Sequence, residues 1–358
     1  MNYGKGIDKS ERNENLQNPI YGANGILNYT NNFLYEGDSI IIGRKGSAGA
    51  LTRVSGKFRP SDVTYYVTKK LPIDIDYLFY GLHTLNIPTL AQGVKPGINR
   101  NDVHGLNILY PPLATQQKIV AKLDEISTTI TQAKTQIENQ LSALEECWQS
   151  SLSESFDNEE WKNRKLSDVC LIERGGSPRP IQKFLTEEKD GVNRIKIGDT
   201  KNQVKYISYT AEKIKPEGVK RSRMVYPGDF ILSNSMSFGK PYIMQTEGCI
   251  HDGRLVLRTD QTINKDFMYF LLGSPFMYSK FEQTATGTGV KNLNIQKVKE
   301  VQIPLPPLEK QEEIVTHLNQ LHENISTLKQ QYQTQLTHYD ELRASVLDQA
   351  FKGELIEE

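Results

Sequence analysis

Two stretches of this sequence nearly repeat each other: PPLATQQKIVAKLDEI at residues 111–126 and PPLEKQEEIVTHLNQL at residues 306–321. The copies lie 195 positions apart, and the alignment runs without a gap from Pro111 and Pro306 to Phe156 and Phe351. Two copies are too few for a solenoid, which needs about three or more stacked repeats. The repeat therefore predicts a pseudo-two-fold molecule with two equivalent halves.

Both copies are predicted to be long helices. Pro-Pro is a helix-start signal, and the apolar residues that follow it alternate in steps of four and three, which is the seam of a coiled coil. At about 1.5 Å per residue, some 40 residues make a rod of roughly 60 Å. The residues expected to pair the helices are Ile119, Leu123, Ile126, Ile130, Ile137, Leu144, Ile314, Leu318, Leu321, Ile325, Leu328 and Leu342.

The simplest cover for the apolar stripe of one helix is the other helix. Because a large globular segment separates the two copies, antiparallel pairing closes the chain most economically. Two alternatives stay open: parallel pairing, which would lose the pseudo-two-fold relation, and a helix that packs only on its own domain.

Charge divides the chain where the repeat does. Residues 1–110 carry a net charge of +3 and residues 161–305 carry +9, whereas residues 111–160 and 306–358 each carry −6. The neutral total therefore hides two basic globular parts joined by two acidic helices. This distribution fits globular parts that meet a polyanion and helices that meet other proteins, although ordinary solvated surface would also explain it.

Bulk properties exclude several other classes of protein. No apolar run reaches the roughly 20 residues that a membrane span needs, and the first residues do not resemble a signal peptide. The three cysteines form no CxxC pair, which fits a reducing cytoplasm, and the six histidines are scattered without metal-ligand spacing. We therefore expect a cytoplasmic protein without a metal site.

The globular segments also resemble each other, though more loosely. Glu36-Gly-Asp and Pro227-Gly-Asp each lead into a predicted buried strand, which is followed by a flexible loop (residues 43–49 or 233–240). A second pair of loops, residues 93–99 and 287–294, precedes short predicted strands at 106–110 and 301–304. The predicted unit is a mixed α/β domain plus a rod, present twice, with the loops most changed between copies.

Catalytic motifs are missing from this sequence. It contains no P-loop, no Asn/Asp-Pro-Pro-Tyr/Phe of an amino-methyltransferase, no Gly-x-Ser-x-Gly elbow and no spaced nuclease carboxylate–lysine set. Gly287-Thr-Gly-Val-Lys lacks the spacing of a Walker phosphate loop and the Ser/Thr that follows its lysine. Loops rich in Gly, Ser, Asn, Lys and Arg are instead suited to approach phosphates and base edges.

Taken together, these features resemble the specificity subunit of type I restriction–modification systems over essentially the whole chain. The resemblance rests on the Pro-Pro-Leu-x-x-Gln signature with its heptad helix, present twice, on the domain opened by Trp161-Lys-Asn-Arg-Lys-Leu-Ser-Asp-Val, and on the ending Phe351-Lys-Gly-Glu-Leu. It implies recognition domains at 1–110 and 159–305, helices at 111–158 and 306–353, and a tail at 354–358.

The resemblance also implies the function and the partners. Each α/β domain would read half of a split duplex DNA target, and the paired helices would set the unread gap and dock two modification subunits. S-adenosylmethionine and ATP would bind to the modification and restriction subunits, so this chain itself would be non-catalytic and without a cofactor.

Loops aligned between the two copies hold the candidate DNA contacts. In the first domain these are Arg44, Lys45, Ser47, Lys95 and Arg100. In the second domain they are Arg179, Lys196, Lys201, Arg221, Arg223, Asn234, Ser235, Lys240, Lys291 and Asn294.

One departure from the family pattern concerns the first domain. Met1 is level with the loop at Gly175 of the second domain, so about 15 residues of an expected opening strand are missing. A truncation, a late start and a permuted arrangement are all consistent with this.

Other classes of function stay open at this stage. The same architecture would suit a two-headed scaffold that holds partner proteins apart without reading DNA. An enzyme with its active site at a domain–rod junction is a further alternative, as is a role in a related system that fuses methylation and cleavage in one polypeptide.

Overall fold

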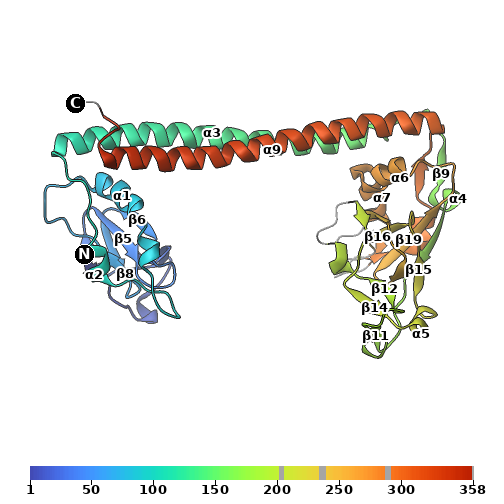
Figure 1. The fold of residues 1–358 in the computed structure, drawn as a ribbon, viewed down its shortest axis with the longest axis horizontal. Coiled ribbons are helices and arrows are strands. Elements are labelled where there is room, and N and C mark those ends of the chain that lie inside the picture. The colour runs from blue at the N-terminus through green and yellow to red at the C-terminus, as the bar shows by residue number, and fades with distance from the viewer. Residues whose placement is uncertain (201–204, 234–238, 287–291, 357–358) are drawn as a thin grey trace. The chain divides into compact units, whose positions relative to one another are not determined.

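The computed structural model describes residues 1–200, 205–233, 239–286 and 292–356, and it divides into two compact units. Unit 1 comprises Met1–Asn139 and Tyr332–Glu358, and unit 2 comprises Gln140–Gln331. Each unit holds one α/β domain and a part of each long helix, α3 (Leu113–Glu154) and α9 (Leu308–Lys352), as Figure 1 shows. Among the described residues, no helix is long and apolar enough to cross a membrane.

The α/β domain of unit 1, domain 1 hereafter, contains two four-stranded sheets. The order β1-β8-β5-β6 is antiparallel throughout, whereas the order β3-β2-β7-β4 contains one parallel pair, β2 with β7. Its elements are β1 (Asn2–Tyr3), η1 (Lys9–Glu11), β2 (Asn18–Gly22), β3 (Gly25–Thr30), β4 (Tyr35–Glu36), β5 (Ser39–Gly43), β6 (Leu51–Val54), β7 (Lys57–Pro60), β8 (Thr64–Tyr66), α1 (Ile75–Thr84), η2 (Ile87–Leu90) and α2 (Arg100–His104).

The α/β domain of unit 2, domain 2 hereafter, contains five-stranded sheets in the orders β10-β19-β16-β17-β13 and β11-β14-β12-β18-β15. Its strands are β9 (Asn163–Lys165), β10 (Cys170–Arg174), β11 (Leu185–Thr186), β12 (Val192–Ile195), β13 (Tyr206–Ile207), β14 (Glu212–Ile214), β15 (Arg223–Val225), β16 (Phe230–Ser233), β17 (Pro241–Met244), β18 (Gly248–Ile250), β19 (Arg254–Thr259), β20 (Ala285–Thr286), β21 (Asn292–Leu293) and β22 (Gln302–Pro304). Its helices are α4 (Leu166–Val169), η3 (Ile181–Lys183), η4 (Ile197–Thr200), α5 (Pro216–Val219), α6 (Lys265–Gly273), α7 (Pro275–Thr284) and α8 (Ile295–Lys299).

The two domains share a common topology, to which domain 2 adds the edge strands β13 and β11. The order β1-β8-β5-β6 of domain 1 corresponds to β10-β19-β16-β17 of domain 2, and β3-β2-β7-β4 corresponds to β14-β12-β18-β15. Both second sheets keep one parallel pair at the same place, β2 with β7 and β12 with β18. The prediction of a mixed α/β domain in two copies is therefore confirmed.

One helix in each domain lies between the sheet and the long helices (Figure 1). In unit 1 this helix is α1, whose Tyr77 belongs to one apolar cluster with Ile119 of α3 and Ala350 of α9. In unit 2 it is α6, whose Phe267 and Leu271 are fully buried in the main core. Each domain is therefore attached to the long helices through packed apolar side chains.

The glutamine of the Pro-Pro-Leu-x-x-Gln signature fixes this attachment. Gln116 Oε1 accepts the backbone N–H of Asp74 at 2.9 Å, and its Nε2 donates to the carbonyl of Pro111 at 2.8 Å. Gln311 makes the same bonds to Asn264 and to Pro306, at 2.9 and 3.0 Å. Asp74 and Asn264 are the N-caps of α1 and α6, so each buried glutamine ties a long helix to the start of the neighbouring short helix.

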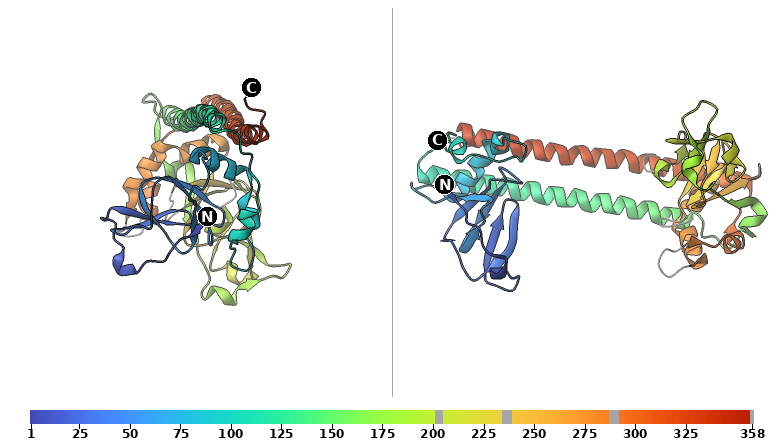
Figure 2. Two further views of the ribbon diagram at one scale, coloured as in Figure 1. Left: turned by 90° about the vertical axis from the view of Figure 1, so that its left-hand side faces the viewer. Right: turned by 90° about the horizontal axis from the view of Figure 1, so that it is seen from below.

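The long helices pair antiparallel within each unit (Figure 2). In unit 1, residues near the start of α3 pack on residues near the end of α9, as Leu123 does in the cluster with Ala350. In unit 2, Trp148 near the end of α3 contacts His322 of α9, with ring centroids 5.1 Å apart. Exposed ion pairs accompany both contacts, Lys134 with Asp340 and Lys329 with Glu145. Antiparallel pairing is therefore confirmed.

The predicted seam is buried over part of its length. Ile119, Leu123, Ile130, Ile137, Ile314, Leu318 and Ile325 are buried, and Ile126, Leu144 and Leu321 are half-buried. Leu328 and Leu342 remain 38% and 47% exposed, so these two residues are poorly covered. A pair of helices covers only a narrow stripe of each partner, so positions that flank the seam keep part of their surface exposed.

The predicted strand at residues 106–110 does not form. Its counterpart β22 pairs with β9, and among the described residues of domain 1 no strand corresponds to β9. A lone extended segment without a ladder partner is not a strand, which explains the difference. The opening strand is represented in domain 1 by β1, whose Tyr3 pairs with Tyr65 as Arg174 pairs with Leu255 in domain 2.

Candidate nucleic-acid interface

In domain 1, tertiary contacts bring the predicted residues of two separate loops together. The backbone carbonyl of Arg44 accepts the N–H of Ile98 at 2.9 Å, and Lys45 forms an isolated bridge with Gly97. The loop that follows β5 therefore lies against the turn that contains Lys95. Gly43 permits the tight loop, because a Cβ there would come within 2.2 Å of the Ser47 carbonyl oxygen.

Tyr3 lies at the centre of a cluster of side chains that also contains Arg44, Tyr65 and Arg100. The guanidinium carbons of Arg44 and Arg100 each lie 5.2 Å from the centroid of its ring, within cation–π distance. Tyr65 packs edge-on against Tyr3 at 5.0 Å and donates a hydrogen bond to the Ile98 carbonyl at 2.8 Å. Two arginines more than 50 residues apart in the sequence, one in the loop after β5 and one at the start of α2, thus lie around one half-exposed aromatic ring.

The positive charge of this cluster is not compensated locally. Within the part of the chain that the structure describes, no carboxylate forms an ion pair with Arg44, Lys45, Lys95 or Arg100. Burial together with the positive charges of the Met1 amino group, Arg100 and Lys70 lowers the pKa of the neighbouring His104. Such a site attracts anions.

Three of the five predicted cations that the structure describes in domain 2 are ion-paired instead. Arg179 pairs with Asp252 at 3.0 Å, Arg223 pairs with Glu173 at 3.1 Å, and Lys196 pairs with Glu212. The hydrogen bond from Lys196 is the main reason that the pKa of Glu212 lies below its usual value. These cations would have to exchange a carboxylate for a phosphate in order to bind DNA.

Three other predicted residues of domain 2 have different surroundings. Arg221 is exposed, with its guanidinium 5.8 Å from the Phe184 ring centroid, and Lys240 is exposed with its ammonium 5.4 Å from that of Tyr242. Asn294 has a structural role, because its side-chain oxygen caps α8 by accepting the N–H groups of Gln296 and Lys297. Lys201, Asn234, Ser235 and Lys291 lie outside the described residues.

Sequence reasoning missed Tyr3 and Arg254. Tyr3 lies in a segment that the sequence comparison placed level with a loop of the second domain, whereas in the structure it belongs to β1. Arg254 begins β19 and is fully buried. Arginine is rarely fully buried, so the sequence pattern offered no reason to single it out.

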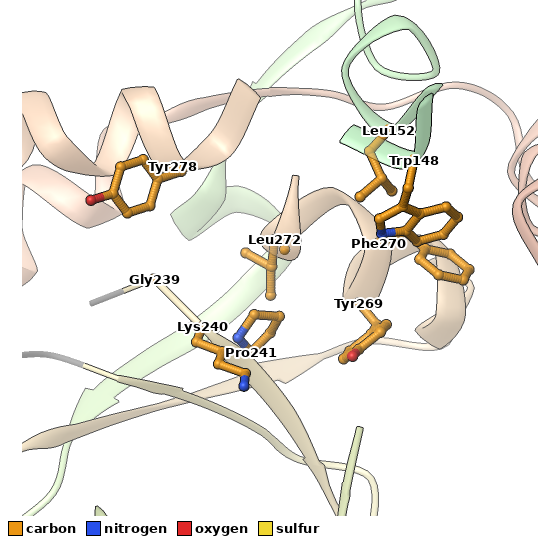
Figure 3. A pocket seen from close by; sticks show the side chains of 10 residues that line it. Trp148, Leu152, Gly239, Lys240, Pro241, Tyr269, Phe270, Leu272 and Tyr278 are labelled. Carbon is orange, nitrogen blue, oxygen red and sulfur yellow. The ribbon is translucent and has the colours of Figure 1, made fainter. Parts of the chain in front are cut away.

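Unit 2 also contains an aromatic pocket of about 590 Å³ (Figure 3). Trp148 and Phe270 lie on one side of it, and Lys240 and Pro241, at the start of β17, lie on another. Among the described residues, no group of three or more His, Cys, Asp or Glu is arranged to hold a metal ion. The pocket is suited to binding an apolar or aromatic group.

Comparison with known proteins gives the family. The sequence profile of the type I restriction modification DNA specificity domain matches residues 1–143 and 158–338, which are the two halves of the repeat. The chain therefore belongs to this family.

Relatives of known name agree with this assignment. A protein of Haemophilus influenzae, named for a type I restriction enzyme specificity subunit, is 25% identical over 90% of this chain and 87% of its own length. The EcoBI specificity subunit of Escherichia coli is 25% identical over 76% of this chain and 63% of its own length.

Two solved structures share the fold. A chain from a type I restriction–modification assembly has a TM-score of 0.73 at 21% identity and covers 90% of this chain and 83% of its own. The HsdS subunit of Thermoanaerobacter tengcongensis has a TM-score of 0.61 at 21% identity, with coverage of 90% and 82%.

Proposed function

We propose that this chain is the DNA-recognition subunit of a type I restriction–modification complex, in which each α/β domain reads one half of a bipartite duplex target. The observation that carries the proposal is the repeated domain itself. Two domains of one topology are attached by equivalent glutamine bridges to a pair of antiparallel helices, and both halves match the specificity-domain profile. Two domains that share a topology and differ in their loops suit the recognition of two different DNA sequences.

The acidic helices are proposed to set the gap between the half-sites and to dock two modification subunits. In this arrangement S-adenosylmethionine would bind to the modification subunits and ATP to the restriction subunits, and the whole complex would act on chromosomal DNA in the cytoplasm. The decisive experiment compares maps of methylated adenine from host genomes with and without this gene. Loss of methylation at one bipartite motif would support the proposal, and an unchanged map would refute it.

Turnover is expected to require a partner subunit. The purified chain, incubated with duplex DNA and radiolabelled S-adenosylmethionine, should transfer no methyl group, because its sequence lacks the motif of an amino-methyltransferase. Adding the modification subunit should start the transfer. Methylation by the isolated chain, measured beside an active methyltransferase as the positive control, would contradict this expectation.

The unpaired cations of domain 1 should contribute more to salt-dependent binding than the paired cations of domain 2. Each phosphate contact adds about 0.9 to the slope of log K against log salt concentration. The variants Arg44→Ala and Arg100→Ala should each reduce the slope by about that amount. Arg223→Ala should reduce it less, because its bond to Glu173 already neutralises its charge in the free protein.

Fluorescence anisotropy with labelled duplex at several salt concentrations measures these slopes. Lys310→Ala, a change of an exposed lysine at the start of α9, is the matched control and should leave the slope unchanged. A wild-type protein whose affinity for duplex does not depend on salt would favour the two-headed scaffold without DNA readout. Equal losses from Arg44→Ala and Lys310→Ala would show that the cluster around Tyr3 is not the contact surface.

A further inference from the structure

Arg254 of domain 2 is a completely buried guanidinium, with 0% of its surface exposed. Its Nη1 donates to the hydroxyl of Ser233 at 3.0 Å, and its Nη2 donates to the hydroxyl of Thr200 at 2.9 Å. Within the described part of the chain, no carboxylate lies within ion-pair distance of it. Its Nε is buried without a hydrogen-bond partner there.

An arginine in such a place is costly to keep. Moving a charged group out of water is strongly unfavourable unless an opposite charge compensates for it. The bonds to two neutral hydroxyls, together with the Tyr242 ring whose centroid lies 5.5 Å from the guanidinium carbon, recover only part of that cost. Burial accordingly lowers the pKa of Arg254. A side chain that served only to fill space would be apolar at this position.

Domain 1 shows that the fold itself does not need this arginine. The ladder pairs Ser233 with Arg254 in domain 2, and it pairs Gly43 with Thr64 at the same place in domain 1. Thr64 is also buried, but its hydroxyl bonds to the nearby Ser61 carbonyl at 2.7 Å and reaches no second loop. The bridge made by Arg254 is therefore specific to domain 2, and the topology that both domains share does not require it.

The two acceptors of Arg254 lie at the ends of two elements that are far apart in the sequence. Thr200 is the last residue of η4, and Ser233 is the last residue of β16. The predicted DNA contacts Lys201, Asn234 and Ser235 follow them directly in the chain. In domain 1 the counterpart of Ser233, Gly43, likewise directly precedes the candidate contacts Arg44 and Lys45.

We propose that Arg254 is a positioning residue for sequence recognition by domain 2, because it holds Thr200 and Ser233 in a fixed relation to each other. The inference rests on the proposed function and names a specificity determinant within it. A single planar guanidinium that donates to both hydroxyls sets the spacing of Thr200 and Ser233. A lone hydroxyl cannot do this, and the flexible ammonium of a lysine can do it only in part.

The test uses the full-length gene, expressed with its modification subunits in a host that lacks its own copy, and maps methylated adenines. Arg254→Met removes the donor of both hydrogen bonds, and Thr200→Val and Ser233→Ala each remove one of the two hydroxyl acceptors. Each should relax base preference in one half of the motif, by about tenfold for Arg254→Met. The other half and the gap should stay as they are in the wild type.

Three comparisons test whether the bridge acts as one unit and within domain 2 alone. Combining Arg254→Met with Thr200→Val should add little to Arg254→Met alone, since both break one bridge. Arg254→Lys should restore part of the preference, and Thr64→Val in domain 1 should not affect the half-site that Arg254→Met relaxes.

If Arg254→Met, Thr200→Val and Ser233→Ala reduce methylation equally and leave the methylated motif unchanged, the bridge only stabilises the fold and the inference is overturned. If Arg254→Met yields no folded protein, the single hydroxyl variants decide in the same way. If the wild-type gene directs methylation at no bipartite motif, the proposed function fails, and this inference fails with it.

Discussion

Removing one heptad from each long helix is expected to shorten the unread gap of the DNA target by about three base pairs. The change deletes Ala133–Asn139 from α3 and Leu328–Thr334 from α9. Seven residues correspond to about 10 Å of helix, and one base pair occupies about 3.4 Å of the duplex axis. No recognition loop is touched, so the bases read in each half-site should stay the same.

The antiparallel seam is expected to survive this double deletion. Leu144 takes the place of Ile137, and Tyr339 takes the place of Tyr332, so the apolar spacing continues on both helices. Seven residues are close to two full turns, which rotates one helix end by only about 20° relative to the other. A gap three base pairs shorter turns one half-site by roughly 100° about the duplex, so weaker binding should accompany the new gap.

Deleting four residues from one helix only should instead put the seam out of register and abolish assembly with the modification subunits. The matched control is the double variant Lys134→Ala with Lys329→Ala. It removes both exposed ion pairs between the helices and changes no length, so the gap should be unaffected. An unchanged gap in the doubly shortened protein would mean that docked subunits, and not the helices, set the spacing.

Replacing Gln311 by leucine is expected to destabilise unit 2 by about 2–4 kcal/mol, since two buried backbone groups lose their partners at about 1–3 kcal/mol each. The groups are the N–H of Asn264 and the carbonyl of Pro306. Asn264 is also the N-cap of α6, and its side chain accepts hydrogen bonds from the first backbone N–H groups of that helix. The substitution therefore weakens the junction between domain 2 and α9.

Thermal unfolding followed by calorimetry measures this effect. At about 2–4 °C per kcal/mol for a domain of this size, the transition of unit 2 should fall by roughly 5–15 °C. Gln311→Glu should lower the transition at least as far as Gln311→Leu at neutral pH, because a buried carboxylate can accept from Asn264 but faces the Pro306 carbonyl without a proton to donate.

Gln331→Leu, which changes an exposed glutamine of α9 within unit 2, is the control and should shift the transition little. If Gln311→Leu and Gln331→Leu shift the transition equally, the glutamine bridge does not hold the domain to the helix. Gln116→Leu should produce the corresponding loss in unit 1, through Asp74 and Pro111.

Much of the architecture could be predicted without coordinates. Apolar residues spaced alternately by four and three positions identified both long helices, and the Pro-Pro-Leu-x-x-Gln signature marked where each helix begins. The prediction of a strand at residues 106–110 was wrong, because a strand needs a hydrogen-bonded partner. In domain 2, β22 pairs with β9, whereas among the described residues of domain 1 no strand corresponds to β9.

The candidate site was harder to predict than the fold. Asn294 looked like a loop residue free to contact a base, but it begins a short helix and its oxygen is used by the backbone. Arg223 and Arg44 look alike in the sequence, and only the structure distinguishes the paired arginine from the unpaired one.

The sequence by itself determined the repeat, the two long helices and the family, because helix periodicity and signature spacing are written in residues close along the chain. Only the tertiary structure decided which cations are compensated, why the signature needs a glutamine, and that Arg254 joins the end of η4 to the end of β16. These properties depend on pairs such as Thr200 with Arg254 or Asn264 with Gln311. Such pairs are about 50 residues apart in the chain and meet only when the sheet and the helices pack.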